Sequence, residues 1–296
     1  MPSSPAAPPS APESLRVATG DGHEAQLLLA AGTAPGPSGL LWLPALGVPA
    51  RKYRHFAAAL AQRGVPVALH EWRGLESSNR RAARDCNWGY AQLLRDIAAS
   101  RAALADAFPS QRWVIGGHSL GAQLAALALA RDPADYAGYL LVGSGHPWWR
   151  TFPGWHKAGL FAVTYGFRAL AALCGYFPGQ RTGFAGREAR GVMQDWAASA
   201  RSGDYRPAQI DFDAEARLRD VAAPALALRL RSDTYAPAAS LEHLLAKLPR
   251  LQLQRDVLGD AEFIGGRAGH FEWMREPEPV VRRVVEWLAG IRRQAP

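Results

Sequence analysis

The chain alternates between short apolar runs and longer stretches with a helical period, and this alternation predicts strands separated by helices. Apolar runs bounded by turn-forming residues predict strands at residues 39–45, 65–72, 112–117, 137–145 and 223–232. Most of these runs are apolar at nearly every position, which is typical of parallel strands covered on both faces. A weaker run, at 251–257, alternates apolar and polar residues and is expected nearer an edge of the sheet.

The segments between these runs predict helices at residues 50–64, 90–108, 120–132, 240–248 and 279–294. In 90–108, apolar residues recur every three or four positions opposite charged ones, as on a surface helix. The segment 120–132 is apolar almost all round, so we expect it to pack centrally on the sheet. Strands that alternate with helices form right-handed βαβ units, so the predicted fold class is α/β, with a mostly parallel central sheet flanked by helices.

One stretch breaks this rhythm, because residues 146–222 are too many for a single crossover helix and are rich in Trp, Tyr and Phe. We predict that they form a helical cap inserted into a core made of residues 15–145 and 223–296. The aromatic residues either contact an apolar group of the substrate or pack together as the core of the cap itself. The apolar segment 159–177 is long enough to raise a membrane-spanning alternative, but Arg168 in its middle and several glycines favour an amphipathic lid helix.

The N-terminal composition and the cysteines indicate the cellular compartment of the protein. Residues 1–14 are rich in Pro, Ala and Ser and lack the basic and apolar regions of a secretory signal, so they predict a disordered tail. Cys86 and Cys174 match no metal or redox spacing and are expected to be reduced, buried thiols. Both observations favour a cytoplasmic protein.

The net charge of +8 raises the question of a nucleic-acid or anionic-membrane partner. However, 31 of the 34 basic residues are Arg, and they are scattered along the chain. Such an excess beside abundant Ala is typical of GC-rich coding, so we interpret most of the charge as background. We expect no nucleic-acid partner. A transient contact of the cap with a membrane or lipid remains open, and the sequence does not determine the oligomeric state.

Residues 117–121 have the sequence Gly-His-Ser-Leu-Gly, which fits the pattern G-x-S-x-G. The pattern alone decides little in a chain with this many Gly and Ser residues. Its context is more specific, because it directly follows the apolar run 112–117 and opens an apolar helical segment. This strand–turn–helix is what a nucleophile elbow needs: a strained Ser119 raised above the sheet, with small residues that let strand and helix approach.

A serine hydroxyl needs a base to take its proton. Of the eight histidines, His270 lies in a Gly-rich loop between the last predicted strand and the last helix, and it is the predicted base. His146, which follows a strand, is its main competitor, and His70 is a weaker one. His118 stands beside the serine on the elbow and cannot fold back onto it.

The base in turn needs a buried carboxylate to hold its tautomer and stabilise the imidazolium. Asp233 directly follows the predicted strand 223–232, at the carboxyl end where catalytic loops gather, and it is the predicted acid. Asp256, Asp260 and Glu262 are its rivals, but they belong to the strand and loop that lead to the base itself.

With these residues in the order Ser, Asp, His, the chain resembles the α/β-hydrolase superfamily across about residues 25–292. The stretch 43–64 resembles the segment after the third strand of that fold, and 72–78 (WRGLESS) resembles its R-G-x-x-S turn. Residues 232–237 (SDTYAP) resemble the D-x-x-x-P that carries the acid, and 269–271 (GHF) carry the histidine. The overall form is similar to a bacterial branch close to serine aminopeptidase-like and monoacylglycerol-lipase-like members.

Two departures from the family pattern are visible. Pro44-Ala45 stand where most relatives have His-Gly in the loop after the third strand, and Ala122 stands where many have a second Gly. The resemblance implies an oxyanion hole made of backbone N–H groups, which need no particular side chain. The predicted donors are Leu120 and, in the first loop, Leu46 or Ala45.

These residues predict a serine hydrolase that cleaves a carboxylic ester or related acyl bond of a small, apolar substrate through an acyl-enzyme. The alternatives are an acyltransferase on the same triad and a catalytically idle hydrolase fold used as a binding module. Ser at the nucleophile position disfavours epoxide hydrolase and haloalkane dehalogenase chemistry. No metal-ligand cluster or phosphate-binding loop accompanies the elbow, so no cofactor and no metal are predicted.

Overall fold

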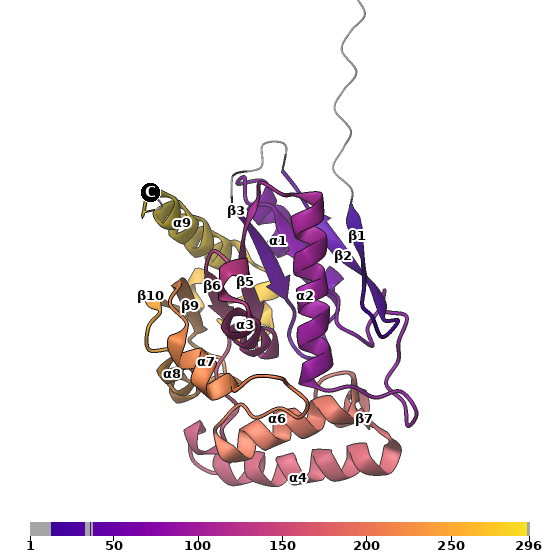
Figure 1. Cartoon of the computed structure of the whole chain (residues 1–296). Coiled ribbons are helices and arrows are strands. Elements are labelled where there is room, and N and C mark those ends of the chain that lie inside the picture. The colour runs from indigo at the N-terminus through magenta and orange to yellow at the C-terminus, as the bar shows by residue number, and fades with distance from the viewer. Residues whose placement is uncertain (1–12, 33–35, 37, 295–296) are drawn as a thin grey trace, which may run out of the picture.

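The computed structural model describes residues 13–32, 36 and 38–294, which form a central sheet with helices on both faces (Figure 1). The strands of this sheet are β1 (Ser14–Ala18), β2 (Glu24–Ala30), β3 (Ser38–Leu43), β4 (Val67–Leu69), β5 (Arg112–His118), β6 (Tyr139–Val142), β9 (Pro224–Leu230) and β10 (Gln252–Leu258). The helices on its faces are α1 (Arg54–Ala61), α2 (Tyr90–Ala107), α3 (Leu120–Arg131), α8 (Ala238–Ala246) and α9 (Glu278–Gln294). Short 3₁₀ turns lie at Ala50–Tyr53 (η1), Pro133–Asp135 (η2), Trp149–Thr151 (η3), Asp260–Glu262 (η4) and Glu272–Met274 (η5).

The sheet has the strand order β1-β2-β4-β3-β5-β6-β9-β10. The strands from β4 to β10 run parallel, whereas β2 is antiparallel to β4 and to β1. Helices α1 and α9 pack together on one face, and α2 and α3 pack on the other. Every residue of α3 except Arg131 is buried, as its apolar sequence predicts. The predicted fold class, α/β with a mostly parallel sheet, is confirmed.

The hairpin of β1 and β2 is not predicted by the sequence analysis. Residues 1–12 of the predicted tail lie outside the described residues, but Ser14, the last residue of that tail, already pairs with Leu28 in β2. Val17 is the one buried residue of β1, so this edge strand lacks the continuous apolar run by which the inner strands are found. Pairing with β2, rather than its own composition, makes it a strand.

A buried polar network joins this hairpin to α2 and to the turn after β4. Arg73 donates hydrogen bonds to Asp96 at 2.6 and 3.0 Å and to Asp21 at 2.6 and 3.3 Å. His23 contacts Asp96 through Nδ1 at 3.2 Å and Ser78 Oγ through Nε2 at 3.1 Å. Arg73 is the first residue of the R-G-x-x-S pattern, whose serine is Ser77, and Ser78 directly follows it. Ser77 Oγ accepts the N–H of Gln26 in β2 at 3.0 Å, so the pattern reflects contacts with the hairpin. Although Ser78, His23 and Asp96 are connected like a triad, all three are enclosed in the protein and serve its structure.

Replacing Asp96 with Asn is expected to destabilise the protein by about 3 kcal/mol at pH 7, because Arg73 then loses its buried anion. Burial by itself would raise the pKa of Asp96, but hydrogen bonds from His23 and Arg73 outweigh it and hold that pKa below its ordinary value. A carboxyl with a lowered folded-state pKa stabilises the fold above its unfolded pKa of about 4, and that stabilisation is lost as the pH falls. Urea unfolding should therefore show a gap between wild type and Asp96→Asn that narrows from pH 7 to pH 3.5. A gap independent of pH would contradict this account.

The inserted segment 146–222 contains α4 (His156–Cys174), β7 (Tyr176–Pro178), α5 (Gly179–Thr182), β8 (Arg187–Ala189), α6 (Arg190–Ser202) and α7 (Ala214–Asp220). Helices α4 and α6 pack against each other and lie across one end of the sheet, whereas α7 packs on α3 (Figure 1). None of the helices in the described residues has both the length and the apolarity needed to span a membrane. The expectation of buried thiols is wrong, because Cys86 is half-buried and Cys174, at the end of α4, is exposed.

Candidate active site

Ser119 occupies the tight turn between β5 and α3. Its backbone has φ of 54° and ψ of −123°, in a region that residues with a side chain rarely adopt. The glycines on either side permit this geometry. A Cβ at Gly117 would lie 2.4 Å from the backbone of Gly121, and a Cβ at Gly121 would lie 2.1 Å from the carbonyl oxygen of Leu43 in β3. The pattern G-x-S-x-G therefore reflects close backbone contacts with both the following helix and the neighbouring strand.

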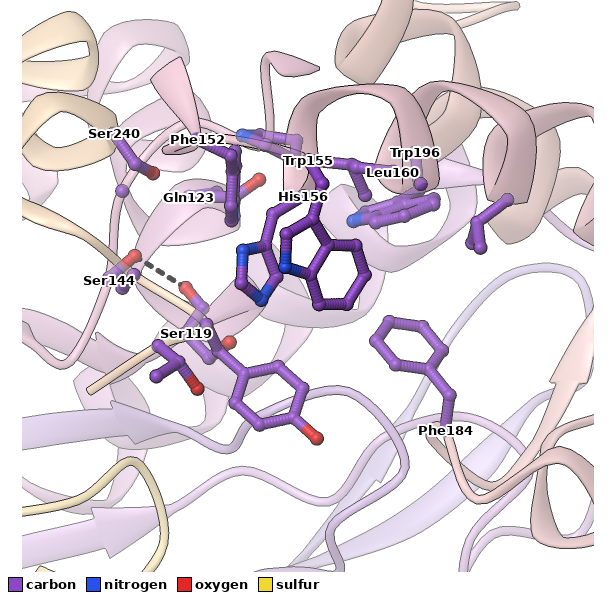
Figure 2. A pocket seen from close by; sticks show the side chains of 17 residues that line it. Ser119, Gln123, Ser144, Phe152, Trp155, His156, Leu160, Phe184, Trp196 and Ser240 are labelled. Atoms are coloured by element: carbon purple, nitrogen blue, oxygen red, sulfur yellow. Dashed lines mark hydrogen bonds between the residues drawn. The ribbon is translucent and has the colours of Figure 1, made fainter. Parts of the chain in front are cut away.

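The turn is also held from the next strand of the sheet. Ser144, just after β6, donates a hydrogen bond from Oγ to the carbonyl oxygen of Ser119 at 2.7 Å, drawn as a dashed line in Figure 2. Because α3 begins directly after Ser119, its first N–H groups favour negative charge beside the serine.

His270 and Asp233 are joined by a hydrogen bond, with Nδ1 of the imidazole 2.7 Å from Oδ2 of the carboxylate. The Asp233 side chain is fully buried and that of His270 is 5% exposed. The other carboxylate oxygen accepts the backbone N–H groups of Tyr235 and Ala236 at 2.8 and 3.0 Å. Three donors therefore fix the carboxylate, which in turn orients the imidazole.

Asp260, one of the rival acids, has a structural role. Its Oδ1 accepts the N–H of Ala268 at 2.7 Å, and its Oδ2 accepts the hydroxyl of Ser232 at 2.8 Å. It thereby holds the histidine loop beside the loop of the acid. The other rivals, Asp256 and Glu262, both pair with an arginine of α9.

The Asp–His pair lies next to the elbow. The ring of His118, the residue before Ser119, has its centroid 4.5 Å from that of His270. A Cβ at Gly143 would lie 3.3 Å from both the His118 ring and the Asp233 carboxylate. Among the described residues, no hydrogen bond joins the Ser119 hydroxyl to the imidazole of His270. The structure thus brings the three predicted residues to one end of the sheet, with Asp233 and His270 bonded to each other.

Tyr53 connects the loop after β3 to the elbow. Its hydroxyl accepts the N–H of Ala45 at 2.9 Å and lies 2.8 Å from Nδ1 of His118, to which it is free to donate its own proton. Burial raises the pKa of Tyr53 above its ordinary value, so the phenol stays a donor. Because the N–H of Ala45 is occupied, Leu46 is the better first oxyanion donor. Within the part of the chain that the structure describes, neither Leu46 nor Leu120 gives its N–H to a protein acceptor.

Comparison with known proteins agrees with the fold described above. A family model described as serine aminopeptidase, S33, matches residues 42–172, a span that includes the elbow but ends before the Asp–His pair. A solved hydrolase from Pseudomonas aeruginosa PA01 has a TM-score of 0.59 and 19% identity, covering 94% of this chain and 99% of that one. A thermophilic esterase from Thermogutta terrifontis has a TM-score of 0.60 and 18% identity, covering 95% of this chain and 99% of that chain. The enol-lactonase from Burkholderia xenovorans LB400 has a TM-score of 0.57 and 18% identity, covering 93% and 100%. No curated protein matches the chain.

The chain has the α/β-hydrolase fold, and the serine aminopeptidase, S33, model matches a little under half of it. The resemblance inferred from its motifs is confirmed at the level of the fold. At these identities the solved structures establish the fold alone, so the substrate of this protein has to be argued from its own site.

The pocket beside Ser119 has a volume of about 390 Å³ and lies between the elbow and α4 (Figure 2). Most of its wall is apolar, with Phe152, Leu160, Val163, Phe184 and Trp196. Its polar side chains include Ser119, Gln123, Ser144, His156 and Ser240. No Asp, Glu, Lys or Arg among the described residues lines it. The described residues also contain no group of three His, Cys, Asp or Glu side chains able to hold a metal ion.

Two polar residues of the pocket escape the sequence analysis. Gln123, one turn after Ser119, is 5% exposed, and its Oε1 has no hydrogen-bond partner among the described residues. It is therefore available to a polar group of a ligand. His156 begins α4 and stacks on Trp155, with 4.0 Å between the ring centroids. Only the path of the inserted segment brings this imidazole to the pocket, so no local pattern could reveal it.

The rival bases lie in the interior, away from the elbow. The ring of His146 lies against Tyr205 and His243, with centroids 4.5 and 4.9 Å away, and burial lowers its pKa far below the ordinary value. His70 is buried and bonded to Ser100 Oγ at 2.9 Å. Both histidines therefore belong to the protein's interior.

His118 is not a predicted catalytic residue, but its contacts give it a positioning role. It packs between the Tyr53 hydroxyl and the His270 ring. Burial lowers the pKa of His118 well below its ordinary value, and the neighbouring His270 lowers it further. His118 is therefore neutral, and it supports the base without adding a competing positive charge.

Proposed function

We propose that this protein is a serine hydrolase that cleaves carboxylic esters of a small, neutral and mostly apolar acyl group. Ser119 is the nucleophile, His270 the base and Asp233 the acid. The observation that carries the proposal is a strained serine on the wall of an apolar pocket, next to His118, whose ring lies 4.5 Å from the His270 imidazole. A buried carboxylate holds that imidazole at 2.7 Å.

The reaction proceeds in two steps. In the first, Nε2 of His270 takes the hydroxyl proton as Oγ of Ser119 attacks the ester carbonyl carbon. The resulting oxyanion accepts the N–H groups of Leu46 and Leu120, and the imidazolium passes its proton to the departing alcohol. In the second step water gives a proton to His270, attacks the acyl-enzyme and releases the carboxylic acid, while Ser119 regains its proton. Asp233 stays ionised and stabilises the imidazolium.

The lining of the pocket supports a neutral substrate. A peptide N-terminus would bring an ammonium group into a pocket whose described lining residues include no carboxylate to pair with it, which is costly. An ester of an alkyl or aryl acid meets no such penalty. Two of the similar solved structures are named as an esterase and an enol-lactonase, which agrees with this choice.

A panel of p-nitrophenyl esters with acyl chains from acetyl to dodecanoyl tests the proposal, with leucine p-nitroanilide as the aminopeptidase substrate. We expect the highest kcat/KM for a neutral chain of intermediate length, and a roughly 10- to 100-fold lower value for a succinyl ester, which would bury an unpaired carboxylate. Adding an alcohol and analysing the products separates hydrolysis from acyl transfer. Faster turnover of the anilide than of every ester would contradict the proposal.

A further inference from the structure

Helix α4 is apolar on both of its sides. Its inner side supplies Gly159, Leu160 and Val163 to the pocket. Its outer face, which we define by six residues, is exposed to solvent: Phe161, Ala162, Tyr165, Ala169, Ala172 and Leu173. Leu173 is 75% exposed and Tyr165 is 51% exposed. A helix that is apolar all round is normally buried, so the outer face is suited to a partner that covers it.

The charges of α4 and of the chain on either side of it have one sign. The charged residues of α4 are Lys157 and Arg168, both exposed and eleven residues apart, which places them on the same flank three turns from each other. No Asp or Glu occurs between Asp135 and Glu188, a stretch that holds five Lys and Arg residues. None of these five forms a salt bridge with another described residue. The surface is therefore complementary to an anionic partner.

The outer face is continuous with the mouth of the pocket. Trp155, directly before α4, is 77% exposed and yet lines the pocket. Figure 2 shows its indole beside His156 above Ser119. An exposed Trp at the end of an apolar face is the arrangement that suits a water–lipid boundary.

We infer that the outer face of α4 docks on an anionic lipid surface, with the mouth of the pocket at the lipid boundary. Because α4 does not combine the length and the apolarity needed to span a bilayer, it would lie in the plane of the interface. A second copy of the chain fits less well, since two-fold pairing of this face would bring cations against cations. The docking stands on these surface features alone, and only its use in collecting ester substrates from the lipid rests on the proposed function.

Cosedimentation of the full chain with vesicles tests the inference. At about 0.1 M salt, wild type should bind phosphatidylcholine vesicles containing 30% phosphatidylglycerol at least tenfold better than pure phosphatidylcholine vesicles. The pair Lys157→Gln and Arg168→Gln should lose about fivefold in affinity per charge on the anionic vesicles alone. The pair Ala162→Glu and Leu173→Glu should lose at least tenfold while hydrolysing a soluble short-chain ester at the wild-type rate, because neither residue lines the pocket.

Ile264→Glu is the matched control, because Ile264 is 98% exposed and lies in a loop of the core. It should bind the anionic vesicles like wild type. No vesicle binding by wild type, or unchanged binding by the double Glu variant, would overturn the inference. A wild-type dimer that does not bind vesicles and that the double Glu variant dissociates would overturn it in favour of self-association. Vesicle binding without ester turnover would instead refute the proposed function and leave the docking intact.

Discussion

Replacing Ser119 with Ala is expected to lower kcat for the best ester by about 10⁴- to 10⁶-fold. The alanine removes the only atom that forms the acyl-enzyme, and the base then has no hydroxyl to deprotonate. The fold should be unaffected, because the Ser119 hydroxyl donates no hydrogen bond to another described residue and alanine can occupy the same strained backbone. The measurement is steady-state hydrolysis of the ester, together with thermal unfolding of both proteins.

Ser144→Ala is the matched control for this loss. It removes a neighbouring hydroxyl that bonds to the Ser119 carbonyl at 2.7 Å but keeps the nucleophile. We expect a kcat within about tenfold of wild type, since one neutral hydrogen bond contributes roughly 1 kcal/mol. If both alanine variants kept nearly full activity, the reaction would not pass through Ser119.

Asp233→Asn is expected to lower kcat by up to about 10⁴-fold, with little change in KM. The N–H groups of Tyr235 and Ala236 require an acceptor, so the amide oxygen of the new Asn takes the place of Oδ1. Its NH₂ group then faces Nδ1 of His270, from which the wild-type carboxylate accepts a hydrogen bond at 2.7 Å. Two donors cannot face each other, so the imidazole shifts its proton to Nε2. That tautomer cannot take the hydroxyl proton of the serine.

The matched control for this variant is Asp256→Asn. Asp256 is a rival candidate for the acid, and it forms a salt bridge with Arg283. The control variant should keep kcat within about twofold, because Asp256 has no contact with the base. The ester assay used for Ser119→Ala measures both variants. A larger loss from Asp256→Asn than from Asp233→Asn would show that the acid is assigned to the wrong residue.

The sequence predicts the parts of this protein that local composition controls. The inner strands and α3 are found because burial on both faces makes them apolar throughout. The elbow is predictable because close backbone contacts require glycine at positions 117 and 121. The contact at Gly121 is made with β3, outside the turn itself. The hairpin of β1 and β2 is missed because its strand character comes from pairing.

The supporting residues of the site lie beyond local patterns for a similar reason. Tyr53 decides between two oxyanion donors by occupying the N–H of Ala45, and this contact depends on how η1 folds back over the loop. His118 and His156 reach the site through the packing of separate segments. A sequence can indicate which side chains carry the chemistry, but the contacts that orient them arise only from the tertiary structure.

The central claim is that the Asp233–His270 pair makes the hydroxyl of Ser119 a nucleophile, and reaction with a fluorophosphonate probe followed by peptide mass spectrometry tests it most directly. The account predicts a single phosphonylated residue, Ser119, in wild type, and a labelling rate at least 100-fold lower in His270→Ala. Labelling of another serine, or equally fast labelling of Ser119 without the imidazole, would contradict it.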